Sequence, residues 1–317
     1  MNRRDFVRFL GVGLAGACAG GRVPWPEAAT AAALEPRLAF LADAHLKDGD
    51  DRRPEAQALA RAVAELRSLK PAPQLILFAG DLAHRGNPAA LSLGREILAD
   101  LPAPCLMLIG EGDCLPDNAA PWRRLFGDPW FTHLLQETEN RKQKTVLQIL
   151  GLHTAWCPGP GGPLFRVGDP GRRWLARELE RLDHEVPLLL LSHAPLDPVF
   201  RPWQQWTLDG PEVLAQLRRF CQVLCLHGHT HQAVASGQWP VVSKGEVFNE
   251  VAFTDNRKLK TGNLLHLSLP ATAWPQPQAI QGTPARLGPG LGPSGCGWAL
   301  LAAEAASFKL QPQLWQA

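Results

Sequence analysis

Five short apolar runs, each followed within three residues by a polar side chain, constrain the fold of this chain more than any other feature. The runs occupy residues 38–41, 75–78, 106–109, 188–191 and 223–226. Apolar runs of this length, bounded by polar residues or glycine, are typical of buried β-strands. Amphipathic helical patterns lie between the runs, as at 54–69. Strands that alternate with helices in this way predict an α/β fold.

The polar segments that follow the predicted strands are rich in carboxylates, imidazoles and glycines. They are Asp43-Ala44-His45, Gly80-Asp81, Gly110-Glu111-Gly112-Asp113, Ser192-His193 and Gly228-His229-Thr230-His231. Each lies at the carboxyl end of a predicted strand, where α/β sheets place their ligand sites. We therefore expect residues that are distant in the sequence to converge on one site.

The order of these segments resembles the calcineurin-like metallophosphoesterase superfamily, over roughly residues 37–232. Its pattern is Asp-x-His, Gly-Asp, Gly-Asn-His-Asp or Glu, an isolated His, and Gly-His-x-His. One such motif alone is weak, whereas all of them in order, each after a strand, are specific. The resemblance implies a four-layer α/β fold, with two mixed β-sheets face to face and helices on both outer faces.

The resemblance also implies a centre of two divalent metal ions, which we expect to be Mn, Fe or Zn. It assigns Asp43, His45 and His231 to the first ion and makes Asp81 the bridging ligand. Two ions held about 3.5–4 Å apart lower the pKa of a bound water and clamp the attacking and leaving oxygens. The implied reaction is hydrolysis of a small phosphoric mono- or diester by a metal-bound hydroxide.

The second ion takes His193 and His229 in the same resemblance, and here the chain departs from the family. Where the family has Asn-His, this chain has Glu111-Gly112. Glu111 can bind a metal, but its negative charge weakens the Lewis acidity of the site. Gly112 cannot protonate the leaving group as the family histidine does, a loss that typically costs about 10²–10⁴-fold in rate. We therefore expect altered or reduced activity.

Two other histidines are candidates to replace the missing proton donor. His84 lies three residues past Asp81, and His153 follows the apolar-rich stretch 146–152. A surface or structural role is the ordinary alternative for a single histidine. Asp113 keeps its place in the third motif, and we expect it to brace the loop as a hydrogen-bond acceptor.

The departure in the third motif leaves a second interpretation open. The chain could be a catalytically degenerate phosphoesterase that binds metal or phosphate and acts as an accessory protein. A serine hydrolase is not favoured, because no Gly-x-Ser-x-Gly segment occurs.

Two tryptophans are candidate substrate contacts. Trp203 and Trp206 follow His193 in a loop that is expected to start on the metal side of the sheet. An indole there could stack on a nucleobase or an aromatic leaving group. Packing of the loop onto the core is the alternative, because tryptophan buries a large surface.

The amino-terminal residues predict export. Arg3-Arg4 followed by Phe6 resembles a twin-arginine signal, and the weakly apolar run 11–21 is too short for a stable membrane span. We expect a removable signal at 1–21, a linker at 22–36, transport by the twin-arginine export machinery and a periplasmic location in a bacterium. A lipoprotein anchored at Cys18 is the less favoured alternative.

Charge and composition bound the remaining possibilities. The chain has 32 Lys and Arg against 30 Asp and Glu, a formal charge of +2, so no nucleic-acid polymer is expected as a partner. We expect the metallophosphoesterase domain to cover 37–270. The Pro- and Gly-rich stretch 271–317 is expected to be a tail with a short final helix near 300–308.

Overall fold

The computed structural model describes most of the chain from residue 37 onward. The described residues are 37–114, 119–139, 142–157, 159, 162, 164–198, 204–231, 241–243, 246–248, 264–273, 296–304 and 307–315. The predicted signal and linker at 1–36 lie outside these residues, so both stay predictions.

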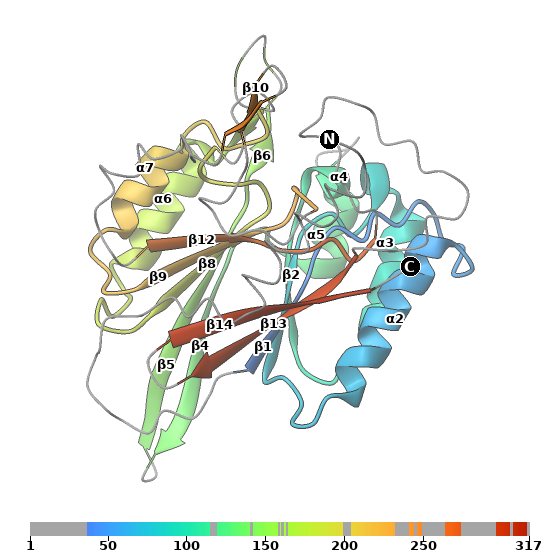
Figure 1. Ribbon diagram of the computed structural model, residues 1–317, viewed down its shortest axis with the longest axis horizontal. Helices are drawn as coiled ribbons and strands as arrows, with labels where there is room; N and C mark the ends of the chain where they lie inside the picture. Colours follow the sequence, from blue (N-terminus) through green and yellow to red (C-terminus); the bar gives the residue numbers. More distant parts are fainter. Residues whose placement is uncertain are drawn as a thin grey trace.

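Two five-stranded mixed sheets form the centre of the structure (Figure 1). The first has the order β14-β13-β1-β2-β3, and β1, β2 and β3 are parallel to one another. β13 runs antiparallel to both β1 and β14. Its strands are β1 (Arg37–Leu41), β2 (Leu75–Ala79), β3 (Cys105–Leu108), β13 (Gly297–Glu304) and β14 (Ser307–Leu314).

The second sheet has the order β12-β9-β8-β5-β4. Its first four strands in that order are parallel, and β4 is antiparallel to β5. The strands are β4 (Phe131–Glu139), β5 (Lys142–Leu152), β8 (Leu188–Ser192), β9 (Val223–His227) and β12 (Leu264–Ser268). Two short ribbons accompany the sheets: β6 (Ala155–Trp156) with β7 (Phe165–Arg166), and β10 (Val241–Ser243) with β11 (Glu246–Phe248).

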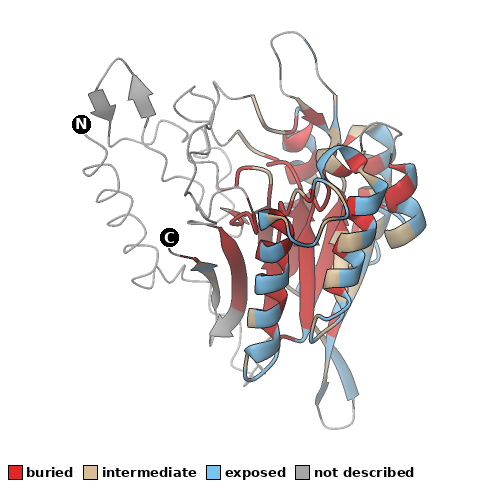
Figure 2. Ribbon diagram, turned by 90° about the vertical axis from the view of Figure 1, so that its right-hand side faces the viewer, coloured by how far each residue is buried: buried red, intermediate tan, exposed pale blue. Residues whose placement is uncertain are grey.

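Helices cover the outer face of each sheet, and their solvent-facing sides are exposed (Figure 2). The first sheet is covered by α2 (Pro54–Ser68), α3 (Pro88–Leu98) and α5 (Ala120–Phe126), and the second by α6 (Gly168–Leu179) and α7 (Gly210–Leu217). The 3-10 helix η1 (His84–Gly86) and helix α4 (Glu111–Cys114) are short elements that follow β2 and β3.

The core between the two sheets explains why the strands are continuous apolar runs. Side chains alternate along each strand, so Leu38 and Phe40 of β1 meet Leu189 and Leu191 of β8 between the sheets. The other residues of β1, such as Leu41, pack under the helices of the first sheet. A strand covered on both faces must be apolar at every position. The predicted four-layer α/β fold is confirmed.

The prediction of a short final helix near 300–308 is wrong. Those residues belong to the antiparallel pair of β13 and β14, and β13 pairs with β1 in the register Phe40↔Ala299. Leu300 packs on the helix side of the sheet and Leu301 between the sheets, which is the alternation of a strand. Pairing with β1 outweighs the helix propensity of this Ala- and Leu-rich run. The described part of 271–317 therefore completes the domain and is not a tail.

A carboxylate on α2 fastens the end of this hairpin. Glu65 Oε2 accepts hydrogen bonds from Trp298 Nε1 at 2.8 Å and from Trp315 Nε1 at 2.9 Å. The guanidinium of Arg61 lies over the Trp315 ring, 4.5 Å from its centroid. The helix and the hairpin are thus joined by contacts between residues more than 230 positions apart.

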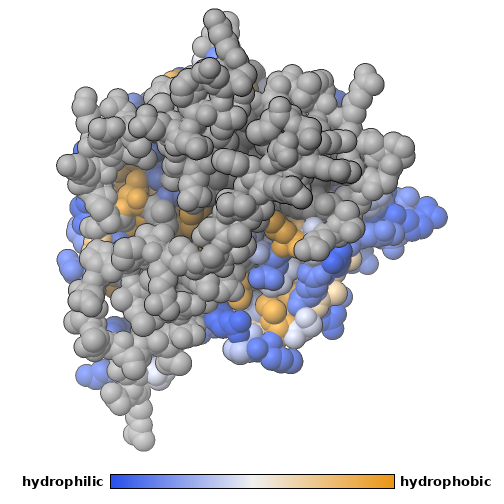
Figure 3. All heavy atoms as spheres, in the orientation of Figure 1, coloured by the Kyte–Doolittle hydropathy of each residue, from blue (hydrophilic) through white to orange (hydrophobic). Residues whose placement is uncertain are grey.

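None of the helices in the described part of the chain has the length and apolarity needed to cross a bilayer. In Figure 3, hydrophilic residues predominate along the right-hand edge of the described surface, the side on which α2 lies in Figure 1.

Candidate metal centre

The candidate ligands lie in the segments that directly follow β1, β2, β3, β8 and β9, at the carboxyl ends of these strands, with Glu111 at the start of α4. Five of them have a positive φ between 48° and 60°: Asp43, His45, Asp81, His229 and His231. Such a φ is uncommon outside glycine, and strained backbone of this kind gathers at functional sites. The turns thus aim these side chains at one place.

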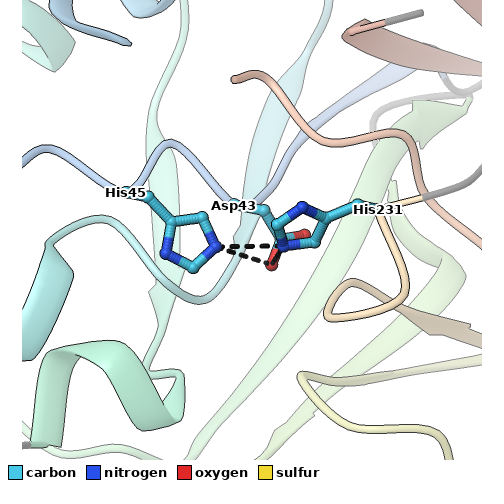
Figure 4. A group of neighbouring side chains, drawn as sticks. All are labelled: Asp43, His45 and His231. Atoms are coloured by element: carbon cyan, nitrogen blue, oxygen red, sulfur yellow. Dashed lines mark hydrogen bonds and ion pairs between the residues drawn. The ribbon is translucent and has the colours of Figure 1, made fainter. Parts of the chain in front are cut away.

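The first ligand set consists of Asp43, His45 and His231 (Figure 4). His231 Nε2 lies 3.3 Å from Asp43 Oδ1, and His45 Nε2 lies 3.9 Å from the same oxygen. The two Nε2 atoms are 3.0 Å apart. Asp43 is fully buried, so its carboxylate faces the imidazoles and not water.

The second ligand set consists of Glu111, His193 and His229. Glu111 Oε2 lies 2.6 Å from His193 Nε2, and Glu111 Oε1 lies 2.9 Å from His229 Nδ1. The main-chain oxygen of Ala79 lies 2.7 Å from His193 Nδ1. Because a carbonyl only accepts, Nδ1 donates this bond and Nε2 is left to face the carboxylate.

Asp81 lies between the two sets. Its Oδ2 is 3.6 Å from His45 Nε2, and its Oδ1 is 3.5 Å from His193 Nε2. One carboxylate oxygen therefore faces each set, as a bridging ligand requires. Asp81 Oδ1 also accepts a hydrogen bond of 2.7 Å from the Gly112 amide.

The donor atoms fit a pair of divalent cations. Within each of three groups the candidate ligand atoms lie within 4.8 Å of one another. His193 Nε2 and Glu111 Oε2 are buried and have no hydrogen-bond partner among the described residues, although they lie close together. A cation bound by both atoms would offset the cost of burying two acceptors side by side. Mixed nitrogen and oxygen donors suit Zn, Fe or Mn.

The electrostatics of the second set favour the same interpretation. Burial acts to raise the pKa of Glu111, but the imidazoles of His229 and His193 hold it well below its usual range. Burial acts to lower the pKa of His193, but Asp81 and Glu111 raise it well above its usual value. Carboxylates that stabilise a positive charge on an imidazole this strongly also stabilise a metal ion in its place.

The structure brings all seven predicted metal ligands together: Asp43, His45, Asp81, Glu111, His193, His229 and His231. Their binding of metal stays a prediction.

The third motif is built tightly around Asp81. A Cβ atom added to Gly112 would lie 2.9 Å from the Ala83 oxygen and 3.0 Å from Asp81 Oδ1, so a side chain there requires the loop to move. Asp113 is fully buried and accepts hydrogen bonds from the Ala83 and Gly110 amides, which is the bracing role expected for it. Burial, followed by the charge of Asp81, raises the pKa of Asp113 to about 8.

The two candidate proton donors lie in different surroundings. His84 is exposed at the start of η1. His153 follows β5, beside the β8 end that carries His193, and its Nδ1 is buried without a hydrogen-bond partner among the described residues. Burial and then the charges of His193 and Arg123 lower the pKa of His153 to about 4. An imidazole that is neutral at pH 7 is a poor acid, so the role stays a prediction that this environment does not favour.

The loop after β8 contains a site residue that the sequence did not reveal. Trp203 lies outside the described residues, and Trp206 is half-buried, so neither substrate contact is tested. In the same loop, before α7 begins, Gln205 places its Oε1 atom 2.8 Å from His229 Nε2. A single glutamine in a loop carries no motif, so only the fold could identify it.

Known proteins resemble this chain in sequence and in fold. A sequence model of the family described as "Calcineurin-like phosphoesterase" matches residues 36–233. A probable glycerophosphodiester phosphodiesterase of Arcobacter nitrofigilis is 27% identical over 192 residues, which cover 58% of this chain and 65% of the relative. The 3',5'-cyclic adenosine monophosphate phosphodiesterase of Escherichia coli K12 is 31% identical over 174 residues, 50% of this chain and 54% of that protein.

The chain thus spans about two thirds or less of the length of these two relatives. A solved structure, a dimetal phosphatase from Danio rerio, has a TM-score of 0.55 at 12% identity and covers 88% of this chain and 96% of its own. That likeness is one of fold alone. The family match, together with the ordered motifs and the four-layer fold, shows that this chain belongs to the calcineurin-like phosphoesterase family.

Proposed function

We propose that this chain hydrolyses small phosphoric diesters with two divalent cations as cofactors. The observation that carries the proposal is the convergence of two nitrogen and oxygen donor sets on a shared carboxylate, Asp81. The names of the two curated relatives, both phosphodiesterases, support diesters as the substrate class.

The residues of the centre have separate tasks in this proposal. When bound, the two cations would supply a water of lowered pKa and neutralise charge on the phosphoryl oxygens. Asp43, His45 and His231 hold one cation, and Glu111, His193 and His229 hold the other. Asp81 fixes the separation of the two sets, and the Gly112 amide orients its carboxylate.

The charge of the centre favours a diester over a monoester. Asp43, Asp81 and Glu111 place three negative charges against the four positive charges of two divalent cations. An asparagine at 111 would leave the centre one unit more positive. A phosphate diester carries one negative charge, whereas a monoester approaches two at pH 7 because its second pKa is about 6. Lowering the positive charge of the centre therefore weakens its attraction for the singly charged diester less than its attraction for the doubly charged monoester.

The missing acid restricts the leaving group. Gly112 offers no proton to the departing alkoxide, so esters of acidic alcohols, which leave without protonation, are hydrolysed fastest. This restriction costs on the order of 10²–10⁴-fold for poor leaving groups.

The test is a comparison of two nitrophenyl esters on protein loaded with Mn²⁺ or Zn²⁺. We expect kcat/KM for bis(p-nitrophenyl) phosphate to exceed that for p-nitrophenyl phosphate. A chain that binds two ions per molecule and hydrolyses neither ester is instead the accessory binding protein that the sequence left open.

We also propose that the chain is exported through the twin-arginine route to the periplasm. The motif Arg3-Arg4 and the small-residue run 11–21 support this location. Replacing both arginines by lysine is expected to leave an unprocessed precursor in the cytoplasmic fraction. Unchanged periplasmic recovery contradicts the proposal, and palmitate incorporation that is lost in Cys18→Ala identifies a lipoprotein.

A further inference from the structure

His229 is held on two opposite sides. Its Nε2 atom lies 2.8 Å from Gln205 Oε1, and its Nδ1 atom lies 2.9 Å from Glu111 Oε1. An amide oxygen only accepts hydrogen bonds, so Nε2 carries the proton in this pair. In the neutral ring the lone pair then belongs to Nδ1, the atom that faces Glu111 and the second ligand set.

The backbone around Gln205 is fixed by a small ribbon. The main-chain oxygens of Gln204 and Trp206 accept hydrogen bonds from the amides of Leu164 and Phe165, at 3.1 and 3.3 Å. The segment 204–206 therefore lies beside β7, and Gln204 has a φ of 56°, a turn that directs the next residue. The position of Gln205 is therefore set by the main-chain hydrogen bonds of its two neighbours.

The same ribbon also limits the rotation of the imidazole. Phe165 is buried, and its ring meets the His229 ring edge to face, with centroids 4.7 Å apart at an angle of 70°. The ring is thus packed on one side and hydrogen-bonded at its tip. Both restraints come from elements outside the five ligand motifs.

We propose that Gln205 is a positioning residue for the second ligand set. Its amide oxygen selects the Nε2–H tautomer of His229 and holds Nδ1 toward the cation that Glu111 and His193 would share. Outer partners of ligating histidines typically change metal affinity by about 10–100-fold. The inference rests on the proposed function for the presence of a metal. Beyond that function, it identifies a residue outside the ligand sets that sets the metal affinity of one of the two sites.

A comparison with His193 shows why this residue is informative. The Nδ1–H of His193 is bound by the main-chain oxygen of Ala79, which no side-chain substitution removes. The partner of His229 is a side chain, so substitution can remove it while the ligand itself stays. Gln205 is therefore the point at which the second set can be weakened without deleting a ligand.

The experiment is a calorimetric titration of metal-free protein with Zn²⁺ or Mn²⁺. Gln205→Leu keeps the approximate volume and removes the acceptor, and we expect one of two binding events to weaken about 10–100-fold while the other is unchanged. Gln205→Glu keeps an acceptor oxygen and is expected to retain both events. Gln57→Leu is the matched control, because it makes the same change at an exposed glutamine of α2, away from the ligand sets.

A second measurement reads the hydrogen bond itself and does not depend on one variant. In the Zn²⁺-loaded protein, we expect the Nε2–H proton of His229 to give a slowly exchanging ¹H resonance in the wild type and in Gln205→Glu. Gln205→Met replaces the leucine variant if that protein does not fold, and it is expected to lose this slowly exchanging resonance.

The outcomes separate this inference from the proposed function. Wild-type affinity at both sites in the leucine and methionine variants, or an unchanged Nε2–H resonance of His229 in both, overturns the inference even if the protein hydrolyses diesters. Selective weakening of one site supports the inference even if no ester is hydrolysed. Fewer than two ions bound by the wild type contradicts both.

Discussion

The two halves of the metal centre are held in different ways. In the first half, main-chain bonds tie the ligand turns together: the Asp43 amide donates to the Gly80 oxygen and the His45 amide to the Asp81 oxygen, each at 2.9 Å. In the second half, Glu111 sits on the four-residue helix α4, and His229 depends on the side chain of Gln205.

This difference coincides with the departure from the family pattern. Asp43, His45 and His231 match the family motifs, whereas Glu111-Gly112 does not. His193 of the second half is also held by the main chain, but Glu111 and the partner of His229 can each be altered by substituting one side chain. We infer that the second half sets how the metal affinity and the ester preference of this protein differ from those of the family.

The largest effect is expected from Asp81→Ala, which removes the residue common to both halves. We expect hydrolysis of bis(p-nitrophenyl) phosphate to fall by roughly 10³-fold or more, because several kcal/mol of charge stabilisation is lost. Bound metal, measured by mass spectrometry, should also fall. Asp51→Asn, an exposed aspartate, is the control. Full activity of Asp81→Ala would refute the shared centre.

The next test separates the halves. His231→Ala removes a ligand of the first set, and His229→Ala removes a ligand of the second. We expect each variant to bind about one ion fewer per chain and to lose on the order of 10²-fold or more in rate. The number of ions bound per chain, measured on the dialysed proteins, tests this expectation. Two ions retained in both variants would contradict the assignment of the sets.

A smaller effect is expected when the charge of the second half is changed. Glu111→Asn makes the centre one unit more positive, so the ratio of monoester to diester hydrolysis should rise roughly tenfold. Steady-state kinetics on the two nitrophenyl esters measure this ratio, and Glu111→Gln is a second neutral variant. An unchanged ratio in both variants removes the charge argument for diesters.

The family histidine is not easily restored at position 112. Because a Cβ atom at Gly112 would lie 2.9 Å from the Ala83 oxygen, Gly112→His forces the loop to shift. We expect even Gly112→Ala to reduce the free energy of unfolding by about 1–3 kcal/mol, the usual cost of overpacking. Urea denaturation measures this loss. Wild-type stability would show that the loop adjusts freely and that histidine could be accommodated.

The smallest effect on activity is expected far from the ligands, at Glu65. Glu65→Leu leaves the indole N–H groups of Trp298 and Trp315 without their acceptor, which should cost about 1–3 kcal/mol of stability while the ester preference is unchanged. The melting temperature and the ratio of the two ester rates are the measurements. A changed ratio of the two ester rates would show that the β13–β14 hairpin influences the metal centre.

The same residue predicts a pH dependence of stability. Burial acts to raise the pKa of Glu65, but the hydrogen bonds from Trp315, Trp298 and Arg61 lower it below its ordinary value of 4.5. A lowered folded-state pKa means that the contribution is present above the unfolded value and is lost as the pH falls below it. The difference in stability between wild type and Glu65→Gln should therefore shrink in acid.

The sequence by itself determined the α/β class and which side chains gather at one site. Apolar runs such as 188–191 specify strands covered on both faces, and the polar residues after them fall at one edge of each sheet because parallel strands end there. This inference needs only the order of residues in the sequence, because each polar motif directly follows its strand.

Only the tertiary structure decided the end of the chain and the partners of the ligands. Residues 297–304 have helix propensity, yet they form β13 because β1 offers an unpaired edge more than 250 positions earlier in the sequence. Gln205 meets His229 because the loop after β8 folds back beside β7. Such contacts depend on where distant backbones meet in space, and no local pattern records that.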